Sequence, residues 1–205
     1  MMFNPLKLGD TIGVFAPSSC LKKSDIEKPV SFIQSLGYNV FVHPQSFEVF
    51  YQSAGTSEQK VIALTDLYPN PDIKAIIAAR GGNRGLHILS GIEFNLLKKY
   101  PKQLIGYSDV TPLLHAVWSK TGHFQVHGPV LRELGDHENA EKLFDLLSTG
   151  KFDYNMKDAV LLREGHAKGQ LFGGNLTLLH HMIGMPYMPD LKGAILFLED
   201  VSEEL

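Results

Sequence analysis

Short apolar runs alternate with longer amphipathic stretches over about the first 150 residues of the chain. Residues 11–16, TIGVFA, and 73–79, IKAIIAA, are continuous apolar runs of strand length, a pattern typical of strands buried on both faces. Further strands are predicted at 38–43, 103–107 and 124–127. Because helical patterns separate these runs, the sequence predicts an α/β domain with a largely parallel sheet flanked by helices.

The predicted helices carry start signals of known types. The spacing of Ser24–Glu27 is that of a capping box, which predicts a helix from there to about Leu36. Thr56 or Ser57 is expected to begin a second helix. Further helices are predicted just after residue 85, at 110–120 and at 138–148.

The pattern changes after Gly150. Residues 151–158 are polar and aperiodic, as in a linker, so we expect a first domain at 1–150 and the start of a second, strand-rich α/β domain at 159–205. A unit of about 45 residues has a marginal core, so this incomplete domain must pack on the first domain, on a partner or on further sequence. Its predicted elements are strands at 159–165, 169–175 and 194–200 and a helix at 176–184.

Composition excludes several classes of function. The chain is 44% hydrophobic and 20% charged with a net charge of -3, so neither nucleic acid nor an anionic membrane surface is an expected partner. Its apolar runs are too short to span a bilayer, and the N-terminus lacks the apolar segment of a secretory signal. Cys20 is the single cysteine and can form no internal disulfide. We therefore predict a cytoplasmic protein.

The stretch LIGYSDVTPLLHAVW, residues 104–118, places Ser108 between a predicted strand and a predicted helix. Such a turn exposes the side chain, and the first helix amides are free to hold an oxyanion. The hydrolase elbow Gly-x-Ser-x-Gly is only half matched, because Gly106 is present but Val110 replaces the second glycine. A nucleophile therefore competes with a simpler interpretation, in which Ser108 or Asp109 caps the helix.

A glycine-rich loop, Arg80–Gly85, follows the apolar run 73–79. Glycines allow backbone amides to approach a ligand closely. The spacing of Gly81, Gly82 and Gly85 matches neither the dinucleotide-binding motif nor the phosphate loop. A ligand-binding loop and a tight turn with positive φ both stay open, and the phosphate loop of a nucleotide-binding protein is a weaker hypothesis.

Two further groups of residues are candidates for chemistry. Glu199 and Asp200 end an apolar run, where one of them could orient a histidine as a triad acid does, or both could be solvated. Among nine histidines, His127 is the one expected near Ser108, although a hydrogen-bonded core or rim histidine is the simpler interpretation. His123 and His127 lie on a predicted strand, so a helical metal pair is not expected.

Six stretches together resemble the LD-carboxypeptidase family of serine peptidases, which includes muramoyltetrapeptide carboxypeptidases and microcin-immunity peptidases. They occur in the order of the family and cover nearly the whole chain. The stretches are GDTIGVFAPSS at 9–19, AARGGNRG at 78–85, LIGYSDVTPLLHA at 104–116, VHGPV at 126–130, GQLFGGNLTLL at 169–179 and ILFLEDVSE at 195–203.

The resemblance implies a Ser-His-Glu triad in which Ser108 is the nucleophile and Glu199 is the acid. It places the oxyanion hole at the backbone amides of Gly82 and Asp109. It implies removal of a terminal D-alanine from murein tetrapeptides in the cytoplasm, without a metal or cofactor, and a homodimer on family grounds alone. Candidate substrate contacts are Arg80, Gly81, Asn83 and His127.

The chain departs from the family pattern at two places. Asn83 stands where a tyrosine usually follows the glycines, which leaves the substrate contacts of this loop open. The family's catalytic histidine lies well downstream of the Leu-Glu-Asp motif, and no residue up to Leu205 matches it. Because a serine hydroxyl without a base is a weak nucleophile, we expect a fragment with two of three triad members. The alternatives are a non-catalytic protein that binds peptide carboxylates and a microcin-type self-immunity peptidase.

Overall fold

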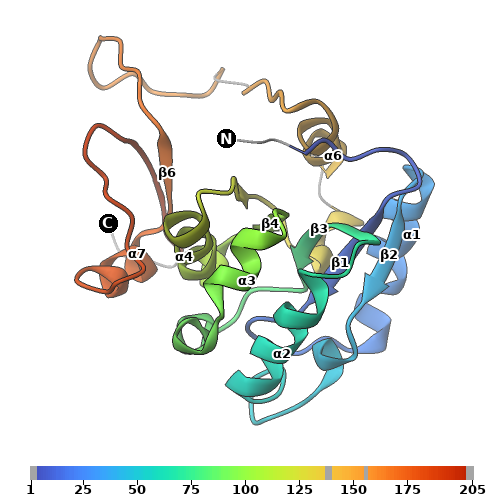
Figure 1. Cartoon of the computed structure of the whole chain (residues 1–205). Helices are drawn as coiled ribbons and strands as arrows, with labels where there is room; N and C mark the ends of the chain where they lie inside the picture. Colours follow the sequence, from blue (N-terminus) through green and yellow to red (C-terminus); the bar gives the residue numbers. More distant parts are fainter. Residues whose placement is uncertain (1–3, 137–139, 155–156, 202–205) are drawn as a thin grey trace.

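The computed structural model describes residues 4–136, 140–154 and 157–201 of the 205-residue chain. Its main sheet has five strands in the order β2-β1-β3-β4-β5, and every neighbouring pair is parallel (Figure 1). This arrangement confirms the predicted α/β fold. The strands are β1 (Thr11–Phe15), β2 (Asn39–Val42), β3 (Ile73–Ala78), β4 (Gln103–Gly106) and β5 (Val126–His127).

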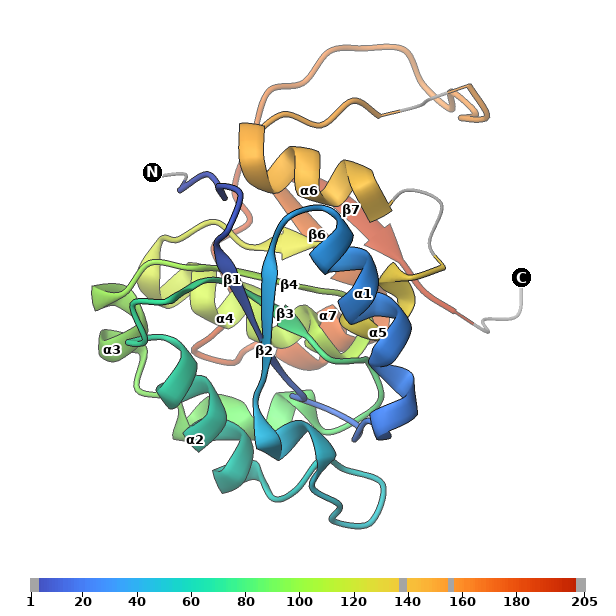
Figure 2. The same cartoon turned by 90° about the vertical axis from the view of Figure 1, so that its right-hand side faces the viewer.

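Helices cover both faces of this sheet, as Figures 1 and 2 show together. One face carries α2 (Ser57–Leu67), the 3-10 helix η3 (Gly85–Gly91), α3 (Phe94–Lys99) and α4 (Thr111–Thr121). The other face carries α1 (Glu27–Ser35), α5 (Leu131–Leu134) and α6 (Ala140–Thr149). Three short 3-10 helices lie in the connections: η1 (Lys23–Asp25), η2 (Pro44–Phe47) and η4 (Ser108–Val110).

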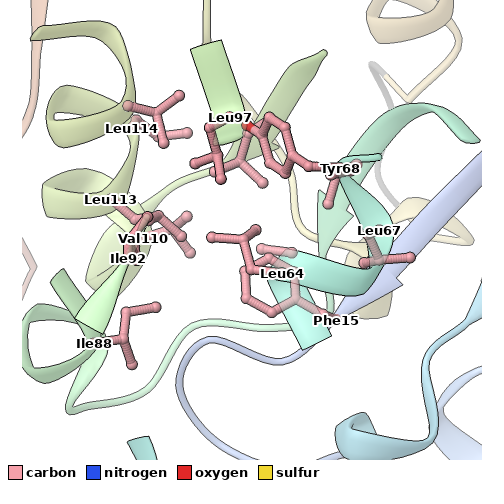
Figure 3. Packing of buried hydrophobic residues seen from close by; sticks show 14 of the residues in the cluster. Phe15, Leu64, Leu67, Tyr68, Ile88, Ile92, Leu97, Val110, Leu113 and Leu114 are labelled. Carbon is pink, nitrogen blue, oxygen red and sulfur yellow. The ribbon is translucent and has the colours of Figure 1, made fainter. Parts of the chain in front are cut away.

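A hydrophobic cluster fills the space between the sheet and α2, α3 and α4 (Figure 3). Phe15 of β1, Leu64 of α2 and Leu113 of α4 belong to it, and each is at most 1% exposed. Burying a side chain of this size contributes about 1.5–3 kcal/mol to folding. Strand β3 gives Ile76 to this cluster and Ile77 to the cluster on the opposite face, which confirms that this strand is buried on both faces.

A second, smaller sheet follows the linker region. It pairs β6 (Leu171–Asn175) in parallel with β7 (Ile195–Glu199), and α7 (Leu176–Met182) lies between the two strands in the chain. Phe172 of β6 packs edge to face on Trp118 of α4, with ring centroids 4.6 Å apart. This small sheet therefore docks on the α4 side of the main domain (Figure 1).

The predicted strand at 159–165 is wrong. These residues form neither strand nor helix, and Leu162 is 93% exposed. A strand needs a neighbour for its backbone hydrogen bonds, and none pairs with this segment within the described residues. The predicted boundary at 151–158 carries no regular structure at the positions described, and the division into domains stays a prediction.

The start of the first helix differs from the prediction, whereas that of the second is confirmed. Asp25 Oδ2 accepts the Lys22 amide at 2.9 Å at the start of η1, and α1 begins only at Glu27, without a side-chain hydrogen bond at its N-cap. In α2, Thr56 is the N-cap, as predicted, and it forms a reciprocal capping box with Gln59.

The remaining helices differ from the prediction for two reasons: two of them are very short, and one predicted helix begins outside the described residues. The short helices α3 and α5 were not predicted, because four to six residues are too few to show a helical period. Residues 138 and 139 of the predicted helix 138–148 lie outside the described residues, and α6 spans Ala140–Thr149. No helix in the described part of the chain is long and apolar enough to cross a membrane.

Candidate active site

Ser108 lies in a sharp turn between β4 and α4. Its φ is 58°, in the left-handed region that residues other than glycine rarely adopt. The following helix packs closely on the strand, since a Cβ at Gly106 would lie 2.9 Å from Val110 Cγ1. A serine held in a strained strand-to-helix turn has the geometry of a nucleophile elbow, even though Val110 replaces the second glycine.

The interpretation of Ser108 or Asp109 as a helix cap is wrong. Neither η4 nor α4 has a side-chain hydrogen bond at its N-cap. The hydroxyl of Ser108 makes no hydrogen bond to any residue that the structure describes. Ser108 Oγ, which is half-buried, is therefore free to meet a ligand.

The glycine-rich loop lies directly against this turn. A Cβ at Gly81 would lie 3.2 Å from Ser108 Oγ, and a Cβ at Gly82 would lie 2.1 Å from Ser19 Oγ. Gly82 also has a φ of 143°, and Arg84 is left-handed with a φ of 71°. Both the close approach and the positive φ require glycine, so the loop backbone is confined between Ser19 and Ser108.

Asp109, the residue after Ser108, is buried and 5% exposed. Its Oδ2 accepts hydrogen bonds from Ser18 Oγ at 2.5 Å and from the Gly85 amide at 2.7 Å. Burial raises the pKa of this carboxyl, and both hydrogen bonds act in the opposite direction. The sequence indicated a helix cap or an oxyanion-binding amide at Asp109, and no pattern in it indicated these hydrogen bonds of the carboxylate.

Glu199 and Asp200 have different surroundings at the end of β7. Asp200 accepts hydrogen bonds from Asn175 Nδ2, Thr177 N and Thr177 Oγ1, so it holds the start of α7. Glu199 is partly buried, and its Oε1 is buried without a hydrogen-bond partner. Burial and the neighbouring Asp200 raise the pKa of Glu199. Neither carboxylate is therefore simply a solvated strand end, because Asp200 is bonded to the start of α7 and one oxygen of Glu199 is buried.

The pKa of Tyr107, the residue before Ser108, is raised. Burial, a hydrogen bond of 2.6 Å to Glu133 and the charges of Glu133 and Glu199 raise the pKa of Tyr107 to about 12. Glu199 makes the smallest of these contributions.

His127 closes the site at the end of β5, where it pairs with Gly106 in the sheet. Its ring centroid is 6.1 Å from that of Tyr107 and 5.4 Å from that of Phe197. Its Nδ1 is buried without a hydrogen-bond partner, and burial lowers its pKa. A hydrogen-bonded core or rim histidine is therefore not what the structure shows, and among the described residues His127 makes no hydrogen bond to Ser108 or Glu199.

The remaining predicted contacts lie on the rim of the loop. Arg80 Nη1 donates to the Cys20 carbonyl at 3.4 Å, and Asn83 Nδ2 donates to Gln52 Oε1 at 3.5 Å.

A cavity of about 600 Å³ opens beside His127, between α4 and the small sheet. In the described part of the chain, no three His, Cys, Asp or Glu side chains are placed to hold a metal ion.

Comparison with known protein families shows which family the chain belongs to. Residues 12–128 match the LD-carboxypeptidase N-terminal domain, and residues 168–205 match the LD-carboxypeptidase C-terminal domain. The architecture is a parallel five-stranded sheet flanked by helices, with the candidate site at the carboxyl edge of that sheet. The chain belongs to the LD-carboxypeptidase family.

Three similar proteins illustrate the relationship. The probable murein peptide carboxypeptidase of Bacillus subtilis strain 168 is 34% identical over 97% of this chain and 65% of its own length. The MccF-like protein of Bacillus anthracis has a TM-score of 0.86 at 26% identity, over 98% of this chain and 70% of that one. The Microcin C7 self-immunity protein MccF of Escherichia coli is 29% identical over 98% of this chain and 69% of its own length. Its structure with aspartyl sulfamoyl adenosine has a TM-score of 0.85 at 26% identity, over 97% of this chain and 70% of that one. The chain therefore spans about two thirds of the length of these relatives.

Proposed function

We propose that this protein is a serine-type LD-carboxypeptidase and that Ser108 is its nucleophile. The observation that carries the proposal is the left-handed φ of 58° at Ser108, whose hydroxyl has no hydrogen-bond partner among the described residues. Backbone strain of this kind costs about 1–3 kcal/mol and persists mainly where function requires it.

The arrangement supports acyl transfer to the serine. Ser108 Oγ would attack the carbonyl carbon of the scissile peptide bond, and the carbonyl oxygen would become an oxyanion. The amides of Gly82 and Asp109 are proposed to donate to this oxyanion, because the loop backbone lies against Ser108. His127 and the adjoining cavity are proposed to bound the substrate site, with Arg80, Gly81 and Asn83 on its opposite rim.

The proton of Ser108 needs an acceptor. Glu199, with one buried oxygen that lacks a partner, is proposed to orient a histidine base. His127 makes no hydrogen bond with either triad candidate in the described residues, so we assign the base to polypeptide that corresponds to the remaining third of the relatives. Without that base, turnover is expected to fall by several orders of magnitude.

The proposed substrate is a murein tetrapeptide, from which the enzyme releases the terminal D-alanine in the cytoplasm. The name of the Bacillus subtilis relative, a probable murein peptide carboxypeptidase, supports this choice. Release of D-alanine from purified tetrapeptide is the direct test, with the 205-residue chain and a version extended to the length of the relatives assayed in parallel.

The decisive variant is Ser108→Ala, with Ser31→Ala on the exposed side of α1 as its matched control. We expect D-alanine release to vanish in Ser108→Ala and to be unchanged in Ser31→Ala. Unchanged turnover in Ser108→Ala would contradict the proposal.

A second candidate is a protein that binds peptide carboxylates without cleaving them. The absence of a base beside Ser108 Oγ in the described residues favours it, since the amides of the site need no base to bind a carboxylate. Calorimetric binding of the tetrapeptide without D-alanine release from either form of the protein would select this candidate.

A third candidate is a self-immunity peptidase of the microcin type, supported by the similarity to MccF. Aspartyl sulfamoyl adenosine, the ligand in the MccF structure, is the appropriate competitor. Stronger inhibition of D-alanine release by this compound than by the free tripeptide product would favour the third candidate over murein recycling.

A further inference from the structure

Lys60 of α2 is a buried cation behind the glycine-rich loop. It is 1% exposed, and its Nζ donates to Ser53 Oγ at 2.6 Å. Burial lowers its pKa to about 8, while the negative charge of Asp109 acts in the opposite direction. A buried ammonium is costly unless an opposite charge and hydrogen bonds compensate it, so its presence here needs a reason.

Two serines connect Lys60 with Asp109. Ser53 Oγ donates to the Ser18 carbonyl at 3.3 Å, and Ser18 Oγ donates to Asp109 Oδ2 at 2.5 Å. Every donor along this path points toward the carboxylate, which is the polarity expected when Lys60 is charged and Asp109 is ionised.

The path joins segments that are distant in sequence around one loop. Asp109 also accepts the Gly85 amide, and a Cβ at Gly85 would lie 2.3 Å from the Asp109 carbonyl oxygen. At the other end of the loop, Gly82 is pressed against Ser19, the residue after Ser18. Moving the Asp109 carboxylate would therefore release both ends of the loop.

We propose that Lys60, Ser53, Ser18 and the Asp109 carboxylate form a positioning unit that holds the Arg80–Gly85 loop on the Ser108 turn. The unit fixes the directions of the Gly82 and Asp109 amides, so that both point at one oxyanion position. Lys60 and the Asp109 side chain act through the loop and touch no substrate. The effect of this unit on catalysis rests on the proposed function. Its effect on the position of the loop does not depend on that function.

The first test measures the loop itself and needs no activity. Hydrogen exchange of the amides at 81–86 is compared between the wild type, Lys60→Met and Asp109→Ala. We expect exchange to be faster by about tenfold or more in both variants, because the acceptor for Gly85 is lost or unpaired. Unchanged exchange in both would overturn the proposal.

Two further variants separate positioning from general destabilisation. Lys102→Met removes another buried lysine, whose Nζ donates to the Asn70 and Ile73 carbonyls at the opposite edge of the sheet. We expect it to leave exchange at 81–86 unchanged. Asp109→Asn retains one oxygen that can accept from both Ser18 and Gly85, so we expect it to keep most of the protection that Asp109→Ala loses. Equal exchange in the Lys60→Met and Lys102→Met variants would show a general effect and overturn the proposal.

The second test measures catalysis in the version extended to the length of the relatives. Misdirected oxyanion amides affect the transition state only, so Lys60→Met should lower kcat about 100-fold with KM within about threefold. Faster loop exchange with unchanged kcat would overturn the positioning role. Absence of D-alanine release from the wild type would count against the proposed function, whereas the exchange result would still decide whether the unit holds the loop.

Discussion

Gly81 faces the hydroxyl of Ser108 across a gap that is too narrow for another side chain. A Cβ at Gly81 would lie 3.2 Å from Ser108 Oγ and 3.3 Å from Ser108 Cβ, closer than side chains normally pack. The backbone of Gly81 does not have a positive φ, so the restriction comes from Ser108 alone.

Gly81→Ala should therefore damage the site more than the fold. The added methyl group displaces Ser108 Oγ by a few tenths of an ångström, and such a shift of a nucleophile costs about tenfold or more in turnover. Gly128→Ala is the control, because its new Cβ would meet neighbours at an ordinary 3.6 Å or more. D-alanine release and thermal unfolding are measured for both variants, and equal turnover would contradict the prediction.

Ser108→Gly is expected to stabilise the protein while it removes the hydroxyl. Glycine adopts the φ of 58° without strain, whereas alanine retains the strain of serine. Urea unfolding should place Ser108→Gly about 0.5–1 kcal/mol above Ser108→Ala, after the greater entropy of glycine in the unfolded chain is allowed for. Should the alanine variant be the more stable of the two, the backbone at this turn is not strained.

Because Lys60 is buried, the free energy of unfolding should depend on pH in the alkaline range. Its pKa of about 8 in the folded protein lies below the 10.5 of a free lysine, so between these values the unfolded chain holds a proton that the folded protein has released. The free energy of unfolding therefore rises with pH, by about 1–2 kcal/mol between about pH 8 and about pH 9.5. Urea titrations should show a smaller rise in Lys60→Met, and an identical rise would mean that the pKa of Lys60 is not lowered in the folded protein.

Substitutions should distinguish the roles of the two neighbouring carboxylates, Glu199 and Asp200. Glu199→Gln removes a charge whose Oε1 has no hydrogen-bond partner, so thermal unfolding should change little while turnover is lost. Asp200→Ala removes the acceptor for Asn175 and Thr177 and should lower the midpoint of thermal unfolding. Loss of turnover in Asp200→Ala without any loss of stability would reverse these roles.

The strands of the main sheet could be predicted from the sequence because their signal is local. The apolar run at 73–79 needs only its own residues to indicate a buried strand. The same reasoning failed at 159–165, where the apolar residues 159–162 have no strand beside them in the described structure. Local pattern identifies a segment that can form a strand, but pairing decides whether it does.

The interior of the site could not be predicted, because its contacts join residues far apart in the chain. Ser18 and Asp109, for example, are 91 positions apart. Lys60 has the sequence context of an exposed helix residue, and nothing near it in the chain indicates burial. The φ of Ser108 likewise follows from how α4 packs on β4 rather than from the residues of the turn.

The small β6–β7 sheet should unfold locally before the main sheet of the 205-residue chain does. Two strands alone are marginally stable, and Leu196, Phe197 and Leu198 of β7 are each about half exposed. Its attachment depends on a few contacts such as that of Phe172 with Trp118. The free energy needed to detach this segment should be far smaller than that of global unfolding. Limited proteolysis should therefore cut near 159–168 first. Since Glu199 lies on β7, each such detachment would carry one catalytic candidate away from Ser108 while the main sheet stays intact.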